Sequence, residues 1–528
     1  MEQFTKNQKE QLKTEIENLS SDRIEFKLSL RKKKFNSLLA KKRNYPSLPN
    51  SSENSYELFL SNIVIPENCK IIYSDNDELI SNALNCMKAE DITTAKYGIC
   101  QIKTYLSYFI DDDTLNFNLN LNFISDLLNL IEKWGERKEK QLVYNILYIM
   151  TNYSFINTNK TIAKILLSSK GYKIWDLCFD MQDYEIMSQL VWTLSNIIYC
   201  DKESSYNLLK SNFFQKKIYN FYSNPTIVRH LNETNKKNIF YIIIERGITL
   251  LTNLLSSDYL SSYNKEERYK LSKPVLGLIL KYSETNSSEI FLACVYSINI
   301  AIDSEPRLID LLDNSNIFNI ILNKKFFSDE KIVLHCNRII GEYCCFKSGM
   351  SQDFYDKCTN YEIDILFGMK SNLVIKEVFW ALSNIIHDNI KSAKNLSEND
   401  PFLDKILYLY KNPIKFEYID TICYFFLTFI PINNLYTFFK LINKGLLDIT
   451  LEHTKNTFDK PKNLKNILEL IEMCLYYGNL GENEFVKTNE IKEKCEFFGL
   501  RDLLRKYEDS EDEEISNIVE KIITDYFE

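Results

Sequence analysis

The chain contains few of the residues that interrupt helices or build common catalytic sites. Among its 528 residues there are only 12 glycines, 10 prolines and 4 histidines. So few glycines and prolines favour long helices over β structure. The four histidines are scattered and are better explained as surface or core residues than as metal ligands: His230, His335, His387 and His453. The sequence has no glycine-rich phosphate loop, nucleophile elbow or paired histidine and carboxylate. We therefore expect neither enzymatic activity nor a cofactor or metal site.

Long apolar runs are also lacking. The run that begins at Tyr241 is cut by Glu245 and Arg246, far short of the roughly 20 residues of a membrane helix. The first residues carry no apolar signal core. The 13 cysteines are odd in number and form no C-x-x-C pair, so reduced thiols are expected rather than a disulfide framework. These features predict an intracellular chain with no membrane association.

Charge is distributed unevenly along the chain. The basic segment, residues 23–44, holds nine Lys or Arg and one acid, a local charge of +8. The whole chain carries −8, which leaves −16 for the rest. The basic side chains are Arg23, Lys27, Arg31, Lys32, Lys33, Lys34, Lys41, Lys42 and Arg43. This complementarity suggests a protein that recognises basic peptides and carries an imitation of one. An acidic body argues against direct binding of nucleic acid.

Composition divides the chain into three parts. We expect the basic segment to lie in residues 1–50, a linker in 51–74 and a helical repeat domain in 75–528. Ile24, Leu28, Phe35 and Leu39 fall on one helical face. A segment with so much charge does not fold alone, but it can become helical on an acidic partner.

A short motif recurs through the repeat domain. It is an apolar stretch that ends in Asn at four places, with equivalent positions at three more: Tyr148–Asn152, Trp192–Asn196, Thr249–Asn253 and Trp380–Asn384, then Tyr296–Ile300, Arg338–Glu342 and Tyr424–Thr428. The intervals are 42 to 47 residues, with a single interval of 57. This period is typical of armadillo or HEAT repeats. We expect an all-α superhelical solenoid whose motif-bearing helices line a concave groove.

The motif has a chemical use as well as a structural one. Residues four apart share one helix face, and an Asn amide can both donate to and accept from a peptide backbone. Successive Trp rings can hold Lys or Arg stems, with a cation–π attraction of about 0.5–2 kcal/mol each. A single W-x-x-x-N motif more often reflects core packing. Two near-identical copies at repeat spacing, V-W-T-L-S-N-I-I and F-W-A-L-S-N-I-I, favour a binding role.

With these residues the chain resembles importin alpha, the adaptor family that carries nuclear-localisation-signal cargo to importin beta. The basic segment resembles the importin-beta-binding segment along its length, including Lys41-Lys42-Arg43-Asn44. The motif repeats resemble the family's ten armadillo repeats, and residues 499–527 resemble the last of them. The resemblance implies importin beta and Lys/Arg-rich cargo as partners, and autoinhibition by the basic segment. It also implies an export receptor at the C-terminal repeats and shuttling between cytoplasm and nucleus.

The resemblance also implies two cargo sites. The residues of the major site are Tyr148, Asn152, Thr161, Gln189, Trp192, Asn196, Asp201 and Asn253. Those of the minor site are Arg338, Glu377, Trp380, Asn384 and Tyr424. Several positions depart from the family pattern. Cys200 stands where the family has the major-site aspartate, so Asp201 is the expected substitute. Tyr148, Thr249, Tyr296 and Tyr424 replace Trp, and Glu342 replaces Asn. Because Thr249 has no ring, one major-site slot is expected to be weak or lost.

Two other classes of protein stay open. A general armadillo scaffold of the catenin type would have no use for the basic segment. A regulatory subunit of an enzyme, built on HEAT repeats, would lack the periodic Trp and Asn.

Overall fold

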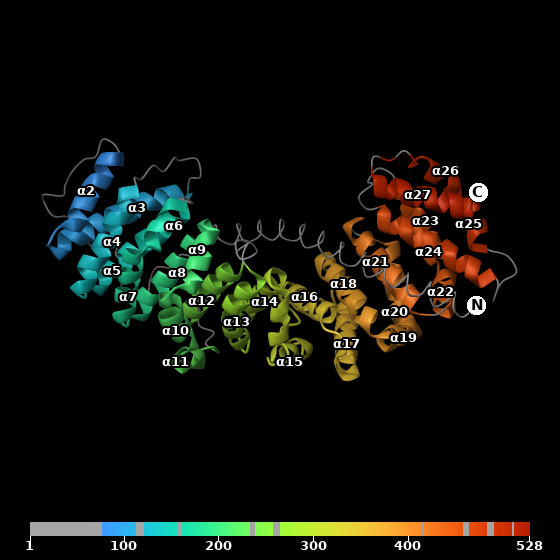
Figure 1. Ribbon diagram of the computed structural model, residues 1–528, viewed down its shortest axis with the longest axis horizontal. Coiled ribbons are helices and arrows are strands. Elements are labelled where there is room, and N and C mark those ends of the chain that lie inside the picture. The colour runs from blue at the N-terminus through green and yellow to red at the C-terminus, as the bar shows by residue number, and fades with distance from the viewer. Residues whose placement is uncertain are drawn as a thin grey trace. The chain divides into compact units, whose positions relative to one another are not determined.

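A computed structural model describes most of the chain beyond the linker. The described residues are 76–111, 121–156, 160–232, 238–256, 264–412, 416–433, 435–457, 464–482, 490–508, 510 and 512–528. The predicted basic segment and the whole of the predicted linker lie outside these ranges. Every regular element within them is a helix and none is a strand, which confirms the all-α prediction (Figure 1).

The chain divides into two compact units. Unit 1 comprises residues up to Val275 with Asp303–Glu305, and unit 2 comprises Leu276–Ile302 and Pro306–Glu528. The helices of unit 1 are α2 (Asn76–Lys88), α3 (Ile92–Asp111), α4 (Leu121–Glu136), α5 (Lys140–Ile156), α6 (Lys160–Leu166), α7 (Ser169–Asp180), α8 (Tyr184–Cys200), α9 (Lys202–Lys210), the π-helix η3 (Phe214–Ile218), α10 (Tyr219–Ser223), α11 (Pro225–Arg229) and α12 (Ile239–Leu255).

Two helices contribute residues to both units, namely α13 (Lys265–Tyr282) and α14 (Ser288–Ser304). The remaining helices belong to unit 2. They are the 3₁₀ helix η5 (Pro306–Leu311), α15 (Ile317–Leu322), α16 (Glu330–Phe346), α17 (Gln352–Gly368), α18 (Asn372–Asp388), α19 (Ile390–Glu398), α20 (Asp400–Lys411), α21 (Phe416–Ile432), α22 (Leu435–Asn443), α23 (Leu446–Asn456), α24 (Lys465–Glu482), α25 (Glu490–Phe498), α26 (Leu500–Arg505) and α27 (Glu513–Tyr526).

Local sequence signals set many of the helix starts. Asp183, Asp329 and Asp512 precede α8, α16 and α27, and each side chain accepts hydrogen bonds from two amides of the first turn. Those amides have no partner within the helix, so the caps satisfy them. Gly445 and Gly499 precede α23 and α26 with φ of 98° and 77°, a backbone conformation that glycine adopts without strain.

Within each unit, long helices pack in sequence order. In unit 1, α3 contacts α5, α5 contacts α8 and α8 contacts α12. In unit 2, α16 contacts α18, α18 contacts α21 and α21 contacts α24. A second row in unit 1 runs from α2 through α4 to α7, and one in unit 2 runs from α20 through α23 to α25. This nearest-neighbour packing is solenoid-like, because each helical layer buries its apolar face against the next.

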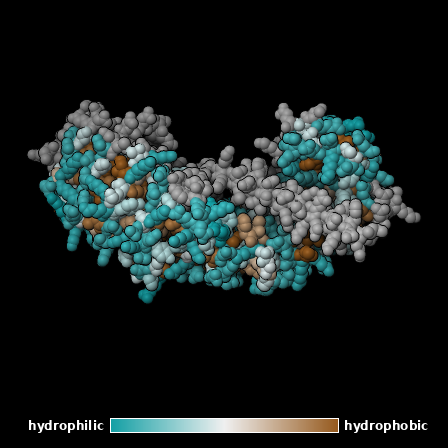
Figure 2. Space-filling model, viewed as in Figure 1, coloured by the Kyte–Doolittle hydropathy of each residue, from teal (hydrophilic) through white to brown (hydrophobic). Residues whose placement is uncertain are grey.

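Most apolar side chains lie inside the layers and most charged ones outside. Trp134, Trp175 and Tyr153 are among the largest fully buried side chains. On the face shown in Figure 2 the described surface is mostly hydrophilic, with small separate apolar patches. The cysteines of the described ranges are free thiols and most are buried. Within those ranges no helix combines the length and the apolar character needed to cross a bilayer.

Candidate functional site

All seven motif segments lie on helices of the same length. These motif helices are α5, α8, α12, α14, α16, α18 and α21, and each has 17 residues. In six of them the motif begins at the ninth residue of the helix, whereas in α12 it begins two residues later, at Thr249. The displaced motif follows the interval of 57 residues. The recurring segments therefore occupy equivalent places in successive layers.

The motif asparagines join neighbouring motif helices. Asn196 Nδ2 donates to the carbonyl of Thr151 at 3.1 Å, and Asn384 Nδ2 donates to that of Gly341 at 3.0 Å. Asn253 Nδ2 donates to the carbonyl of Ser195 at 3.1 Å and to its hydroxyl at 2.8 Å. In all three cases the acceptor residue directly precedes the equivalent motif position of the previous motif helix. Each asparagine amide therefore fixes the register of its helix against the previous motif helix.

An asparagine side chain has two N–H donors and one acceptor oxygen, so the contact to the previous helix uses only one of its groups. Asn196 and Asn384 are half-buried, whereas Asn152 and Asn253 are 7% and 5% exposed. We refer to Tyr148, Asn152, Gln189, Trp192, Asn196 and Asn253 together as the major surface. They lie on α5, α8 and α12, which pack in that order, so the structure brings them together.

Trp192 is half-buried and stacks with a cation of the chain itself. The guanidinium carbon of Arg246, on α12, lies 5.2 Å from the centroid of the Trp192 ring. Arg246 Nη1 donates to Ser188 Oγ at 3.2 Å and to Gln189 Oε1 at 3.1 Å. Gln189 is 2% exposed, and its Nε2 donates to Thr151 Oγ1 at 2.6 Å. Thus both ends of the Gln189 amide are engaged within the protein.

The other ring of the major surface also faces a cation. Lys103 Nζ, on α3, lies 4.5 Å from the centroid of the Tyr148 ring and donates to Asn145 Oδ1 at 3.0 Å. The sequence interpretation missed both Lys103 and Arg246. The only signal for Arg246 was a charge that interrupts an otherwise apolar helix, three residues before Thr249.

The two remaining residues predicted for the major site lie on neighbouring elements of unit 1. Asp201 stands between α8 and α9, is 4% exposed and accepts a hydrogen bond from Ser204 Oγ at 2.7 Å. This contact turns the Asp201 carboxylate toward the first turn of α9. Thr161 is exposed on α6. The predicted contact of Asp201 and Thr161 with a cargo lysine stays a prediction.

In unit 2 the predicted minor site lies on α16, α18 and α21, which also pack in order. Trp380 is 9% exposed and its indole lies against Gly341: a Cβ at Gly341 would come within 2.2 Å of Trp380 Cζ3. Arg338 is 8% exposed, whereas Glu377 and Tyr424 are half-buried. The structure therefore brings Arg338, Trp380 and Asn384 onto adjacent helices, with Trp380 more enclosed than an open slot requires.

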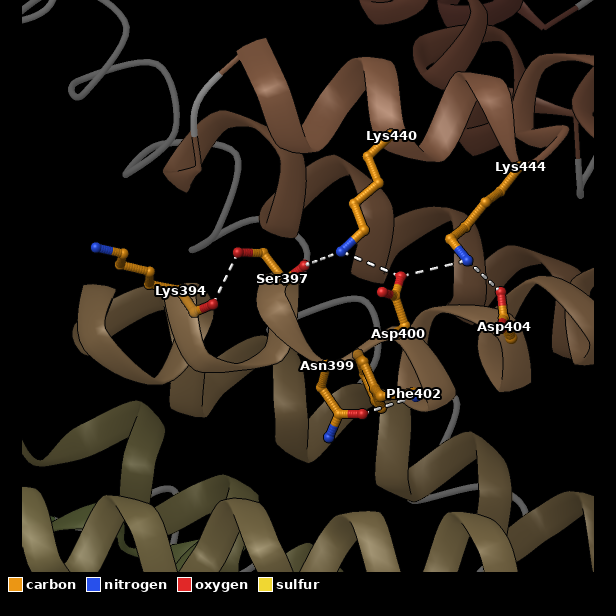
Figure 3. Close-up of polar contacts among 8 residues, drawn as sticks. All are labelled: Lys394, Ser397, Asn399, Asp400, Phe402, Asp404, Lys440 and Lys444. Carbon is orange, nitrogen blue, oxygen red and sulfur yellow. Dashed lines mark hydrogen bonds and ion pairs between the residues drawn. The ribbon is translucent and has the colours of Figure 1, made fainter.

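Charged side chains bridge successive layers away from the motif helices. In Figure 3, Lys440 Nζ lies 3.1 Å from Asp400 Oδ1 and donates to the carbonyl of Ser397 at 3.1 Å. Lys444 Nζ lies 3.3 Å from Asp400 and 2.6 Å from Asp404. Hydrogen bonds from the two lysines hold the pKa of Asp400 below its ordinary value. Similar Lys–acid pairs join layers elsewhere, but their exposure limits their effect on stability.

Comparison with known proteins finds a similar fold but no family. No protein-family model and no curated protein matches the sequence. The structure is similar to an engineered protein solved by the Northeast Structural Genomics Consortium, with a TM-score of 0.61 and 11% identity over 85% of this chain and 99% of that one. A second engineered protein from that consortium aligns with 49% of this chain and 96% of its own, at 12% identity and a TM-score of 0.36. At such identity the first likeness concerns the helical fold alone.

Proposed function

We propose that this chain is an armadillo-repeat nuclear import adaptor that binds Lys/Arg-rich localisation signals and links them to importin beta. The observation that carries the proposal is the recurrence of an aromatic–asparagine pair at the same place of three motif helices, α5, α8 and α18. The resemblance of the basic segment to an importin-beta-binding segment supports it. The adaptor would act by binding alone, because no step of this function makes or breaks a covalent bond.

On this proposal an extended peptide lies across the motif helices of the major surface. The half-buried amide of Asn196 keeps donor and acceptor capacity for a peptide backbone after its contact with Thr151. The rings of Tyr148 and Trp192 provide faces for aliphatic stems. The net charge of −16 outside the basic segment attracts a cationic peptide and raises its association rate. The predicted minor site in unit 2 would hold a second basic cluster on Trp380 and Asn384.

The second candidate, a general armadillo scaffold, would use the same helices but not the basic segment. Only the adaptor explains why nine basic residues precede an acidic body. Binding of importin beta distinguishes the two hypotheses. The adaptor hypothesis predicts that residues 1–50 capture importin beta, and the scaffold hypothesis predicts that they do not.

The cargo proposal is tested by titrating the full chain with a fluorescent lysine-rich signal peptide. Changing Trp192 and Asn196 together to alanine should weaken binding about 10- to 100-fold, because a stacking face and a backbone contact are both lost. A matched control is Asn220→Ala. Asn220 is exposed on α10 and donates only to the Lys216 carbonyl of its own helical region. Unchanged affinity in the Trp192 and Asn196 double variant would refute the proposed site.

A further inference from the structure

Arg246 is the least expected group of the major surface, because a surface that binds only basic side chains should not carry an unneutralised cation. Its guanidinium stacks on Trp192, and its two hydrogen bonds go to the neutral groups of Ser188 and Gln189. Among the described residues no carboxylate forms an ion pair with it. Glu245, the neighbouring acid that acts on it electrostatically, is exposed.

The surroundings raise the energetic cost of this cation. Arg246 is half-buried, with its guanidinium against α8, and burial lowers its pKa, while Tyr144 and Glu245 oppose that shift. Arginine nevertheless stays protonated at any physiological pH. A desolvated charge without a counter-ion is costly unless an anion can approach it.

The geometry of Arg246 leaves it able to bind such an anion. A guanidinium has five N–H donors in a planar fork, and the described residues engage one nitrogen, Nη1. Nε and Nη2 carry the remaining donors and make no hydrogen bond within the described part of the chain. The hydrogen bonds to Ser188 and Gln189 and the stack on Trp192 hold the fork in place, which lowers the entropic cost of binding a carboxylate.

We propose that Arg246 is a carboxylate site in the major surface and selects a peptide with an acidic side chain at the position that faces Trp192. This inference builds on the peptide-binding function proposed above and names its specificity. Arg246 occupies one face of the Trp192 ring and presents its free N–H donors there, so the preferred ligand has a Glu or Asp opposite Arg246 and basic residues on either side of it. Lys103, stacked on Tyr148, adds positive charge to the same row.

The test uses the full chain and pairs of fluorescent peptides. In a lysine-rich peptide each position is replaced in turn by Glu and, as its neutral isostere, by Gln. At one position the Glu peptide should bind about tenfold more tightly than the Gln peptide, because a charge-assisted bidentate contact forms only with the carboxylate. Arg246→Gln should abolish that difference, and Arg246→Lys should keep only part of it. The matched control, Arg229→Gln, removes the same charge from an exposed site of unit 1 and should preserve it.

The outcomes separate this inference from the function on which it builds. The inference is overturned if Glu is no better than Gln at every position, or if its advantage survives in Arg246→Gln. If no lysine-rich peptide binds at all, the nuclear import proposal fails. A lysine-free alanine peptide with one Glu, compared with its Gln partner, then decides the carboxylate site alone. A Glu advantage that depends on Arg246 supports the site, and equal binding overturns it.

Discussion

Gly341 lies directly beneath the indole of Trp380. The two residues stand on neighbouring motif helices, α16 and α18, and a Cβ at Gly341 would come within 2.2 Å of Trp380 Cζ3 and 2.6 Å of Cε3. The carbonyl of Gly341 also accepts the amide of Asn384 at 3.0 Å. The Trp–Asn pair of α18 thus holds one backbone position of α16 from two sides, and only glycine leaves room for it.

This relationship predicts that Gly341→Ala destabilises unit 2 although alanine favours helices. The new methyl group must displace the buried indole, at a cost of about 1–3 kcal/mol in the free energy of unfolding. Gly277→Ala is the matched control: Gly277 is exposed on α13, nothing lies within 4 Å of its Cβ position, and the change should stabilise by about 0.5–1 kcal/mol. Urea unfolding measures both. Equal effects of the two changes would show that Trp380 moves away freely.

The contact of Asn196 with α5 gives a second prediction. Asn196→Ala should lower the free energy of unfolding by about 0.5–1.5 kcal/mol, because the hydrogen bond to the Thr151 carbonyl is lost. Asn196→Asp should cost more, because a carboxylate oxygen then faces the carbonyl with no hydrogen between them. The same pair of changes at exposed Asn220 should alter stability by less than about 0.5 kcal/mol. If aspartate and alanine at position 196 are equivalent, the contact does not hold the two helices together.

A buried ion pair in unit 1 gives a third prediction. Arg268 Nε lies 2.9 Å from Glu305 Oε2, with side chains 13% and 3% exposed. Glu305→Ala should destabilise by about 3–5 kcal/mol, because it leaves a buried guanidinium without its partner. Adding Arg268→Met to Glu305→Leu should recover most of the loss. Asp353→Asn, which breaks the exposed pair of Asp353 with Lys357, serves as control and should have little effect in the same thermal melts. If Glu305→Ala were no more destabilising than Asp353→Asn, the Arg268–Glu305 pair would not be the buried ion pair inferred here.

The sequence was enough to predict the all-helical fold. Few glycines and prolines and a period near 44 residues are local or periodic signals, and they survive in a single sequence. The ninth-residue position of six motifs agrees with that period, although the helix starts themselves come from the structure. In α12 the motif starts two residues later, after the insertion that precedes this helix. Asn253 nevertheless keeps its hydrogen bond to Ser195.

What the sequence did not reveal depends on contacts between layers. Arg246 and Gln189 are separated by 57 residues, so nothing local indicates that the guanidinium reaches the amide. The fit of Gly341 under Trp380 likewise depends on how far one helix is offset on the next. Pattern alone therefore predicted open Trp slots, whereas packing encloses Trp380 and places Arg246 on Trp192.

The basic segment gives a fourth prediction, which depends on the proposed function. Changing Lys41, Lys42 and Arg43 to alanine should tighten binding of a lysine-rich peptide to the full chain. A tethered competitor acts at an effective concentration on the order of millimolar, and the variant no longer competes. Changing Lys32, Lys33 and Lys34 removes the same charge from another part of the segment and should leave the affinity unchanged. Equal effects of the two triple variants would indicate a general electrostatic effect of the basic segment. If neither variant changed the affinity, the autoinhibition hypothesis would be wrong.

Glu362 of α17 gives the last prediction, a dependence of stability on pH. Its side chain is fully buried, and neither oxygen has a hydrogen-bond partner among the described residues. Burial, with the proximity of Cys344 and Glu377 adding to it, raises the pKa of Glu362 well above its ordinary value. The folded state therefore retains a proton that the unfolded chain releases near pH 4.5, and unit 2 loses stability as the pH rises above that value. The loss is about 1.4 kcal/mol for each pH unit up to the folded-state pKa. Glu362→Gln should flatten this slope in urea unfolding between pH 4.5 and 8, whereas Glu398→Gln, at an exposed site of α19, should not. A slope that is unchanged in Glu362→Gln would mean that another group causes it.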